Sequence, residues 1–354
     1  MKRIPKYFPN RGARNLPSRF LVPGLLLLGI IITFGIAFFF IDPVGFRRTL
    51  FQPVREVFFF QRELGAITHW DKIQKVVICE GSEVVIPGGN GFQIFAGLRA
   101  PHRENPSPAI LLLHGSSPWG RKIGLIRLLA LRFEEGGWVV LSPDARGFGR
   151  TSDPQDTLTN PEAWAVKNDV RRCIDFLSAH NRTDPHRIYV LGHSMGAGHA
   201  LEGALEDPRV RGLILIGPPV FNSGAKTSLW IRARFSADRE LQQPISEEVM
   251  KARILSTDIS ISAKGGPLKT SNKQILLIAG EREGELNLAF LARVSEESSP
   301  PIIYRTLPET DHYCGVYNLF GSDSIYYRPD IFDPFMSMVL EYLGKNEAEK
   351  SQKK

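Results

Sequence analysis

Hydrophobic residues form short runs from residue 75 onward, and after residue 109 these runs alternate with segments of helical periodicity. The first strand-length runs, separated by turn residues, are Val76 to Cys79, Glu83 to Ile86 and Phe92 to Leu98. Later strand-like runs cover 109–113, 138–141, 188–191, 210–216, 274–278 and 301–306, and helical patterns cover about 123–135, 162–179 and 197–205. Apolar runs separated by helices are typical of a parallel sheet covered on both faces. The pattern therefore predicts an α/β fold, with a mostly parallel sheet and an antiparallel start.

About fifty residues, 221–272, interrupt this alternation and contain amphipathic pieces such as 247–255 but no strong strand. An insertion at this point would lie above the carboxyl ends of the strands, where ligands bind in open α/β sheets. We interpret it as a small lid, with a surface excursion as the alternative.

The amino-terminal part of the chain has a different pattern, because residues 20–41 contain no charge and are rich in Leu, Ile and Phe. As a helix this stretch would be about 33 Å long, enough to cross a hydrocarbon core of roughly 30 Å. A buried core helix of this length would have a polar face. A cleaved signal peptide would have a shorter apolar region that ends in small residues, whereas Phe38 to Phe40 end this one. The stretch is predicted to be an uncleaved, single-pass membrane anchor.

Charge flanking this stretch predicts its orientation. Six Lys or Arg residues and no acid lie in 1–19, against three arginines in a comparable window after the span. By the positive-inside rule, 1–19 is a cytoplasmic tail and the larger part of the chain lies on the exoplasmic side, whether periplasmic, lumenal or extracellular. The predicted organisation continues with a juxtamembrane connector over 42–74, a globular domain over 75–345 and a polar tail over 346–354.

Composition narrows the classes of function. The net charge of +7 over 354 residues owes much to the first nineteen, so the remainder is close to balanced and a nucleic-acid partner is not expected. The three cysteines are widely separated and lack metal-ligand or redox spacing. We therefore expect no metal and no cofactor.

One motif indicates nucleophilic chemistry. Gly192-His193-Ser194-Met195-Gly196 follows a predicted strand and precedes a predicted helix, which is the context of a G-x-S-x-G nucleophile elbow. A serine nucleophile needs a histidine base and an acid, and in this architecture they follow it in the order acid, then histidine. Of eight histidines, only His199 and His312 follow Ser194, and His199 is too close in sequence to fold back. His312 is the candidate base.

The acid is expected after the strand 274–278, where Glu281, Glu283 and Glu285 follow one another at alternate positions. Glu283 lies at the usual distance beyond the strand, and its two neighbours remain alternatives. Asp311 is adjacent to the base, and consecutive side chains in an extended loop diverge, so we expect it to be structural.

A tetrahedral oxyanion needs two preorganised N–H donors. Met195, the residue after the nucleophile, is expected to supply one. The other is expected from the loop after Leu113, where Gly115 allows close backbone approach and leaves the amide of Ser116 or Ser117 facing the site.

Together these motifs resemble an α/β-hydrolase from about Phe92 to Leu343, most similar to the lysophospholipase and serine-aminopeptidase-like branch. The residues that carry the resemblance are His114-Gly115, Asp144 to Gly149, Gly192 to Gly196, Gly280 to Glu283 and Asp311-His312. The resemblance implies Ser194 as nucleophile, His312 as base and Glu283 as acid, although the family usually has Asp at the last position. It also implies that Asp144 to Gly149 form a structural turn near the site.

These observations predict a membrane-anchored serine hydrolase that acts on an ester, thioester or amide bond of a small-molecule, lipid or peptide acyl substrate. The alternative is a catalytically silent α/β-hydrolase fold that acts as a binding or scaffold protein at the membrane. The oligomeric state stays open.

Overall fold

The computed structural model of the chain describes residues 70–351, apart from 90, 104, 118, 153–159, 161–165, 221–246, 260–272, 299–301 and 319–320. The chain divides into two units, Met1–Pro53 and Val54–Lys354, and the described residues all belong to the second. The predicted tail, the predicted anchor and the connector up to residue 69 lie outside the described residues. Within the described part, no helix is long and apolar enough to span a membrane. The anchor therefore stays a prediction.

An eight-stranded sheet forms the centre of the second unit, in the order β2-β3-β5-β4-β6-β7-β8-β9. Its strands are β2 (Ser82–Gly89), β3 (Phe92–Arg99), β4 (Ser107–Leu113), β5 (Val139–Pro143), β6 (Thr183–His193), β7 (Val210–Ile216), β8 (Gln274–Gly280) and β9 (Ile303–Leu307). β3 runs antiparallel to both of its neighbours, and every pair from β5 to β9 is parallel. The predicted antiparallel start and parallel sheet are both confirmed.

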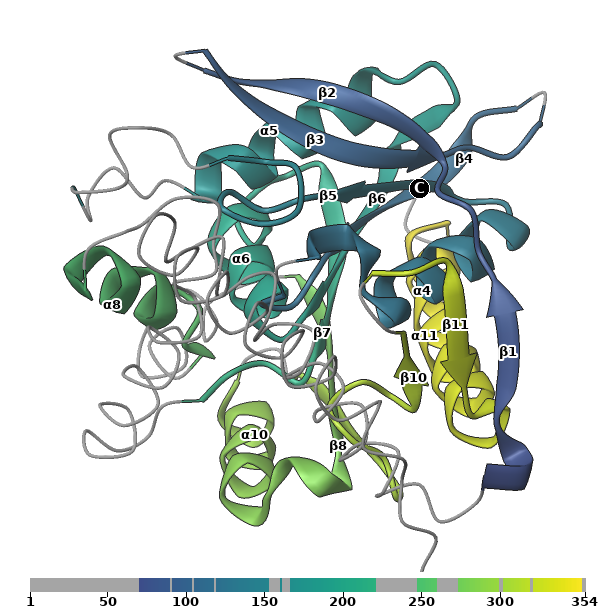
Figure 1. Cartoon of the computed structure of the whole chain (residues 1–354), viewed down its shortest axis with the longest axis vertical. Coiled ribbons are helices and arrows are strands. Elements are labelled where there is room, and N and C mark those ends of the chain that lie inside the picture. The colour runs from purple at the N-terminus through teal and green to yellow at the C-terminus, as the bar shows by residue number, and fades with distance from the viewer. Residues whose placement is uncertain are drawn as a thin grey trace, which may run out of the picture. The chain divides into compact units, whose positions relative to one another are not determined.

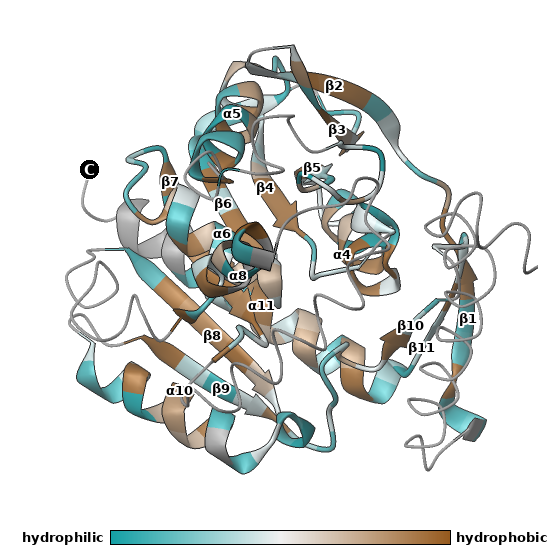
Figure 2. Cartoon of the chain, turned by 60° about the vertical axis from the view of Figure 1, so that its left-hand side comes forward, coloured by the Kyte–Doolittle hydropathy of each residue, from teal (hydrophilic) through white to brown (hydrophobic). Residues whose placement is uncertain are grey.

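Helices cover both faces of this sheet (Figure 1). They are α4 (Gly124–Glu135), α5 (Val166–Ala179), α6 (Met195–Ala204), α10 (Glu285–Glu297) and α11 (Pro329–Ser351). Because successive strand residues point to opposite faces, Ala109 and Leu111 of β4 pack in the core beside α5, α6 and α10, whereas Ile110 and Leu112 pack beside α4 and α11. Burial on both faces explains the continuous apolar runs, which Figure 2 shows along β4 and β8. α11 continues into the residues predicted as a polar tail.

A second, three-stranded sheet has the order β1-β11-β10 and was not expected. β1 (Gln74–Val77) pairs antiparallel with β11 (Ser324–Tyr327), which pairs antiparallel with β10 (Val316–Tyr317). The strand predicted near 76–79 thus joins this small sheet and not the main one. Strands this short, with a partner some 250 residues away, leave no periodic pattern in the sequence.

Most of the predicted lid, 221–246 and 260–272, lies outside the described residues. Its described part contains α8 (Glu247–Ser256), which is followed by Thr257 and Ile259. A Cβ at Gly198 of α6 would overlap the Thr257 backbone, so this turn packs directly on the helix behind the elbow. Ile259 is 1% exposed and joins the core on the same face. The role of the insertion stays a prediction.

Candidate active site

The loops that carry the predicted site residues leave the same edge of the main sheet. Gly115 follows β4, Ser194 follows β6, Glu283 follows β8 and His312 follows β9. Because these strands are parallel, their carboxyl ends meet at one edge, where open α/β sheets bind ligands.

Ser194 has a strained backbone conformation at the turn between β6 and α6. Its φ is 53° and its ψ is −120°, and it stands at the N-cap of α6. Non-glycine residues rarely adopt such a conformation, which costs about 1–3 kcal/mol. The turn is held by the Ser194 N–H, which donates to the Ile216 carbonyl at 2.8 Å. A Cβ at Gly192 would overlap the Gly196 carbonyl, and one at Gly196 would overlap the Leu113 carbonyl. Both glycines of the motif are therefore steric requirements.

Glu283 and His312 are brought together. Glu283 Oε2 lies 3.2 Å from His312 Nδ1, and the Glu283 side chain is 8% exposed against 36% for His312. The other carboxylate oxygen, Oε1, accepts from the Gly280 N–H at 3.3 Å. The two loops are also joined by the Arg282 N–H, which donates to the Thr310 carbonyl at 3.0 Å. A proton on Nδ1 that faces the carboxylate leaves Nε2 of His312 as the basic nitrogen.

The alternative acids are engaged elsewhere. Glu281 is exposed and accepts the Glu309 N–H at 3.0 Å. Glu285 is exposed in the first turn of α10. Asp311 accepts the N–H groups of Tyr313 and Gly315. Only Glu283, among the acids considered from the sequence, has a carboxylate facing the His312 ring.

Residues 217–222, which follow β7, contain no carboxylate, and the structure gives a steric reason why this segment begins with glycine. Gly217 has a φ of 50°, and a Cβ there would lie 2.8 Å from both Glu283 Oε1 and His312 Nδ1. Any larger residue would push the acid and the histidine apart.

His193, the residue before Ser194, supports His312. It is fully buried, its Nε2 donates to the His312 carbonyl at 2.8 Å, and the two rings lie 4.8 Å apart. Burial, together with the charge of a protonated His312, lowers the pKa of His193 to about 3, so its ring is neutral. In the sequence, only its position next to Ser194 could have indicated this contact with His312.

The segment Gly115–Ser116 lies against the elbow, because a Cβ at Gly115 would be 3.1 Å from Ser194 Cβ. His114 is 2% exposed and bridges two loops, with Nδ1 donating to the Gly115 carbonyl at 2.6 Å and Nε2 accepting from the Ala145 N–H at 2.9 Å. The Gly115 carbonyl and the Ser116 N–H belong to the same trans peptide unit and point in opposite directions. Because the carbonyl faces His114, the Ser116 N–H points away from His114. Burial lowers the pKa of His114 and keeps this bridge neutral.

Met195 supplies the first N–H of α6, one of four at a helix start without an intrahelical acceptor. The amide of Met195, and that of Ser116 or Ser117, stay the predicted oxyanion donors beside Ser194. The positive end of the helix dipole favours negative charge at the same place.

A buried ion pair holds the end of the loop that begins at Gly115. Asp144, 1% exposed, binds the Arg121 guanidinium and accepts the Arg121 N–H at 2.8 Å and the Arg150 N–H at 3.0 Å. Arg121 also binds Glu83 of β2. A Cβ at Gly120 or Gly149 would overlap the Asp144 carboxylate. The segment that begins at Asp144 is thus a structural turn beside the site, as the resemblance implies.

Cys314, close to His312, is another side chain that could act as a nucleophile. Cys314 is buried, and burial together with the charges of Asp311 and Glu283 raises the pKa of its thiol well above the ordinary value. It therefore stays a thiol. Across the described ranges, no group of His, Cys, Asp and Glu side chains is arranged to hold a metal ion.

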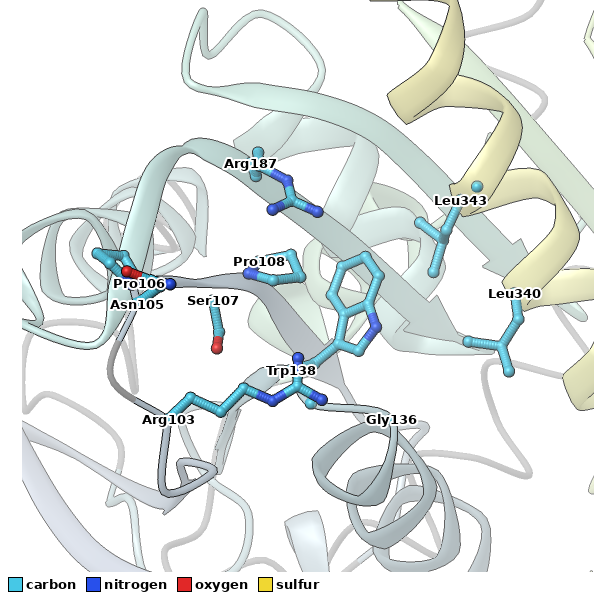
Figure 3. Close-up of a pocket in the computed structure, with 12 residues that line it drawn as sticks. Arg103, Asn105, Pro106, Ser107, Pro108, Gly136, Trp138, Arg187, Leu340 and Leu343 are labelled. Carbon is cyan, nitrogen blue, oxygen red and sulfur yellow. The ribbon is translucent and has the colours of Figure 1, made fainter. Parts of the chain in front are cut away.

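A cavity of about 720 Å³ lies at the other end of the strands (Figure 3). It is bordered by Ser107 and Pro108 at the start of β4, Trp138 just before β5, and Leu340 and Leu343 of α11. Because this is the amino-terminal edge of the parallel strands, the cavity is not the cleft that Ser194 would serve.

Comparison with known proteins places these features in one family. A family model described as "Alpha/beta hydrolase family" matches residues 110–308. The esterase EstD of Thermotoga maritima is 33% identical over 124 residues, which are 34% of this chain and 29% of that protein. The 2-hydroxymuconate semialdehyde hydrolase of a Pseudomonas species is 30% identical over 126 residues, 35% and 41% of the two chains. This chain thus spans less than half the length of the curated relatives it matches.

Solved structures share the fold at low identity. A soluble variant of monoglyceride lipase from Saccharomyces cerevisiae has a TM-score of 0.55 and 13% identity, covering 77% of this chain and 96% of its own. The α/β hydrolase GrgF of a Penicillium species has a TM-score of 0.54 and 15% identity, covering 75% and 99%. These matches confirm the predicted fold.

Proposed function

The chain belongs to the α/β-hydrolase family, and on this premise we propose that it is a serine hydrolase in which Ser194, His312 and Glu283 form the catalytic triad. The observation that carries the proposal is the 3.2 Å pair of His312 Nδ1 and Glu283 Oε2 at the sheet edge where Ser194 has a strained backbone. A histidine oriented by a buried carboxylate is what a serine needs to become a nucleophile.

In the proposed reaction, Ser194 Oγ attacks the acyl carbonyl carbon and its proton passes to His312 Nε2. The carbonyl oxygen becomes an oxyanion, which accepts hydrogen bonds from the Met195 and Ser116 amides; each such donor is typically worth about 3–4 kcal/mol of barrier. His312 then gives its proton to the leaving group, and the acyl group stays on Ser194. A water molecule, deprotonated by His312, attacks the acyl-enzyme, and His312 then returns the proton to Ser194 Oγ as the bond between Oγ and the acyl carbon breaks and the acid leaves. Glu283 stabilises the imidazolium at both stages.

The proposed substrate is an acyl ester, with thioesters and amides as further candidates. Support comes from the names of similar proteins, an esterase and a monoglyceride lipase among them. The resemblance to the lysophospholipase and serine-aminopeptidase-like branch agrees with either an ester or a short peptide.

The test is covalent labelling of the purified full chain by a fluorophosphonate probe, which reports nucleophilic serine without knowledge of the substrate. We expect labelling of the wild type, none of Ser194→Ala, and a rate lower by at least about 10³-fold for His312→Ala. An unlabelled wild type, or labelling that survives Ser194→Ala, would favour the silent scaffold instead.

A matched pair of variants tests which residue is the acid. Glu283→Gln is expected to lower the labelling rate by about 10²- to 10⁴-fold, because the imidazole loses the charge that orients it. Glu281→Gln changes the same type of residue two positions away, where the carboxylate binds the Glu309 amide, and is expected to label at the wild-type rate. The opposite result would assign the acid to Glu281.

We also propose that residues 20–41 anchor the protein in a membrane with the hydrolase domain on the exoplasmic side. The support is the uncharged 22-residue stretch and the excess of basic residues before it. Protease treatment of sealed vesicles tests this. In sealed vesicles whose cytoplasmic side faces outward, the hydrolase domain is expected to be protected. Its cleavage there would overturn the orientation, and release of the chain by carbonate washing would overturn the anchor.

A further inference from the structure

Two strands of the small sheet, β10 and β11, follow His312 in the chain. β10 begins four residues after His312, and the hairpin of β10 and β11 fills the interval between the candidate base and α11. The main sheet ends at β9, and neither β10 nor β11 pairs with any of its strands. The contacts of the hairpin therefore indicate what it contributes.

The first contact is with the turn that carries His312. Asp311, 9% exposed, accepts the Tyr313 N–H at 3.0 Å and the Gly315 N–H at 3.1 Å through Oδ1, and the Tyr317 hydroxyl donates to Oδ2. Cys314 and Gly315 in this turn have φ values of 53° and 69°, so the turn is tight. Both carboxylate oxygens of Asp311 are thus occupied, one by the turn itself and one by β10.

The second contact is with the other half of the site. Asn318, the residue after β10, accepts the Gly124 N–H at 2.7 Å and donates to the Lys122 carbonyl at 2.8 Å. A Cβ at Gly321 would be 3.2 Å from the side chains of Trp119 and Lys122. The hairpin therefore holds the downstream end of the loop that begins at Gly115.

We propose that this hairpin positions the two halves of the active site relative to each other, with Tyr317 acting through Asp311 on His312 and Asn318 acting on the loop that contains Ser116. Tyr317 and Asn318 are adjacent in sequence, so a single backbone segment links the base to the oxyanion loop. The inference rests on the proposed serine mechanism for its catalytic consequence. Misplacement of a catalytic group by about 1 Å can lower a rate by about 10²-fold, so a buried hydrogen bond at this link has a measurable effect.

The variant that tests the link is Tyr317→Phe, which removes one hydroxyl. Tyr327→Phe is its matched control. The two tyrosines are 8% and 7% exposed in the same small sheet, but the Tyr327 hydroxyl donates to Gln74 of β1 at 3.1 Å, away from His312. Thermal melting of both variants shows whether their losses of stability are comparable.

Hydrogen–deuterium exchange of the full chain is the readout that needs no activity. We expect faster exchange of the segment 311–315 in Tyr317→Phe and wild-type exchange there in Tyr327→Phe. Equal exchange in this segment for both variants overturns the inference, whether or not the chain is labelled at serine.

Labelling by the fluorophosphonate probe gives the catalytic readout and separates the two proposals. For Tyr317→Phe we expect a maximal labelling rate lower by about 10-fold or more, with the probe concentration at half-maximal rate within about twofold of the wild type, and no change for Tyr327→Phe. An unlabelled wild type contradicts the serine mechanism, and the positioning role is then decided by exchange alone. A labelled wild type with unaffected Tyr317→Phe, or equal losses in both variants, overturns the positioning role and leaves the mechanism intact.

Discussion

Acid is expected to destabilise the domain through His193. The unfolded ring binds a proton below pH 6.5, whereas burial and the neighbouring His312 hold the folded ring neutral down to about 3. Between these values the unfolded state binds more protons, so stability falls as pH falls, by about 1.4 kcal/mol per pH unit once the unfolded ring is fully protonated. From pH 7 to pH 5 the expected contribution of His193 is a loss of about 2 kcal/mol.

The perturbation that isolates this contribution is His193→Asn, which keeps a polar side chain but cannot titrate. Urea unfolding of the full chain, followed by tryptophan fluorescence at pH 7 and pH 5, gives the free energy of unfolding for each protein. His114 has a lowered pKa for the same reason and adds a loss of the same sign, so the wild type changes by more than His193 alone explains. His114 is present in both proteins, so its contribution cancels when the change in the free energy of unfolding of His193→Asn is subtracted from that of the wild type.

His186 supplies the control, because it is an exposed histidine on the same strand. His186→Asn is expected to show the pH dependence of the wild type, and His193→Asn a dependence weaker by about 2 kcal/mol. Equal losses on acidification in the wild type and in His193→Asn would refute the reasoning, since the ring would then gain its proton without unfolding.

Three further expectations concern stability and are checked by the same unfolding measurement. Gly196→Ala should destabilise the fold by more than 2 kcal/mol, or prevent folding, because its Cβ would overlap the Leu113 carbonyl. Gly344→Ala should stabilise it by about 0.5–1 kcal/mol, since no atom lies within 4 Å of the added Cβ and alanine favours the helix; a loss of stability there would contradict this. Arg121→Gln should cost about 3–5 kcal/mol, because Asp144 would keep a buried charge without its ion pair, and an effect below about 1 kcal/mol would show that Asp144 finds another partner.

The sequence narrows the position of the acid to three glutamates but does not choose between them. Spacing after the strand favoured Glu283 but left Glu281 and Glu285 open, because a glutamate at any of three alternate positions is compatible with a short loop. The choice depends on which carboxylate turns inward, and that is set by the short 3-10 helix over Glu281–Glu283. Backbone geometry of this kind leaves no periodic signal.

The amino-acid sequence by itself determined the strands, the helices that cover them and the order of the site loops. Buried parallel strands must be apolar throughout, and an elbow such as Gly192 to Gly196 admits few residue types. Tertiary structure alone decided which side chains meet across long separations, as in the ring of His193 on His312 or the hydroxyl of Tyr317 on Asp311. Such contacts depend on where whole loops pack, and a single polar residue is chemically compatible with many partners until the fold selects one.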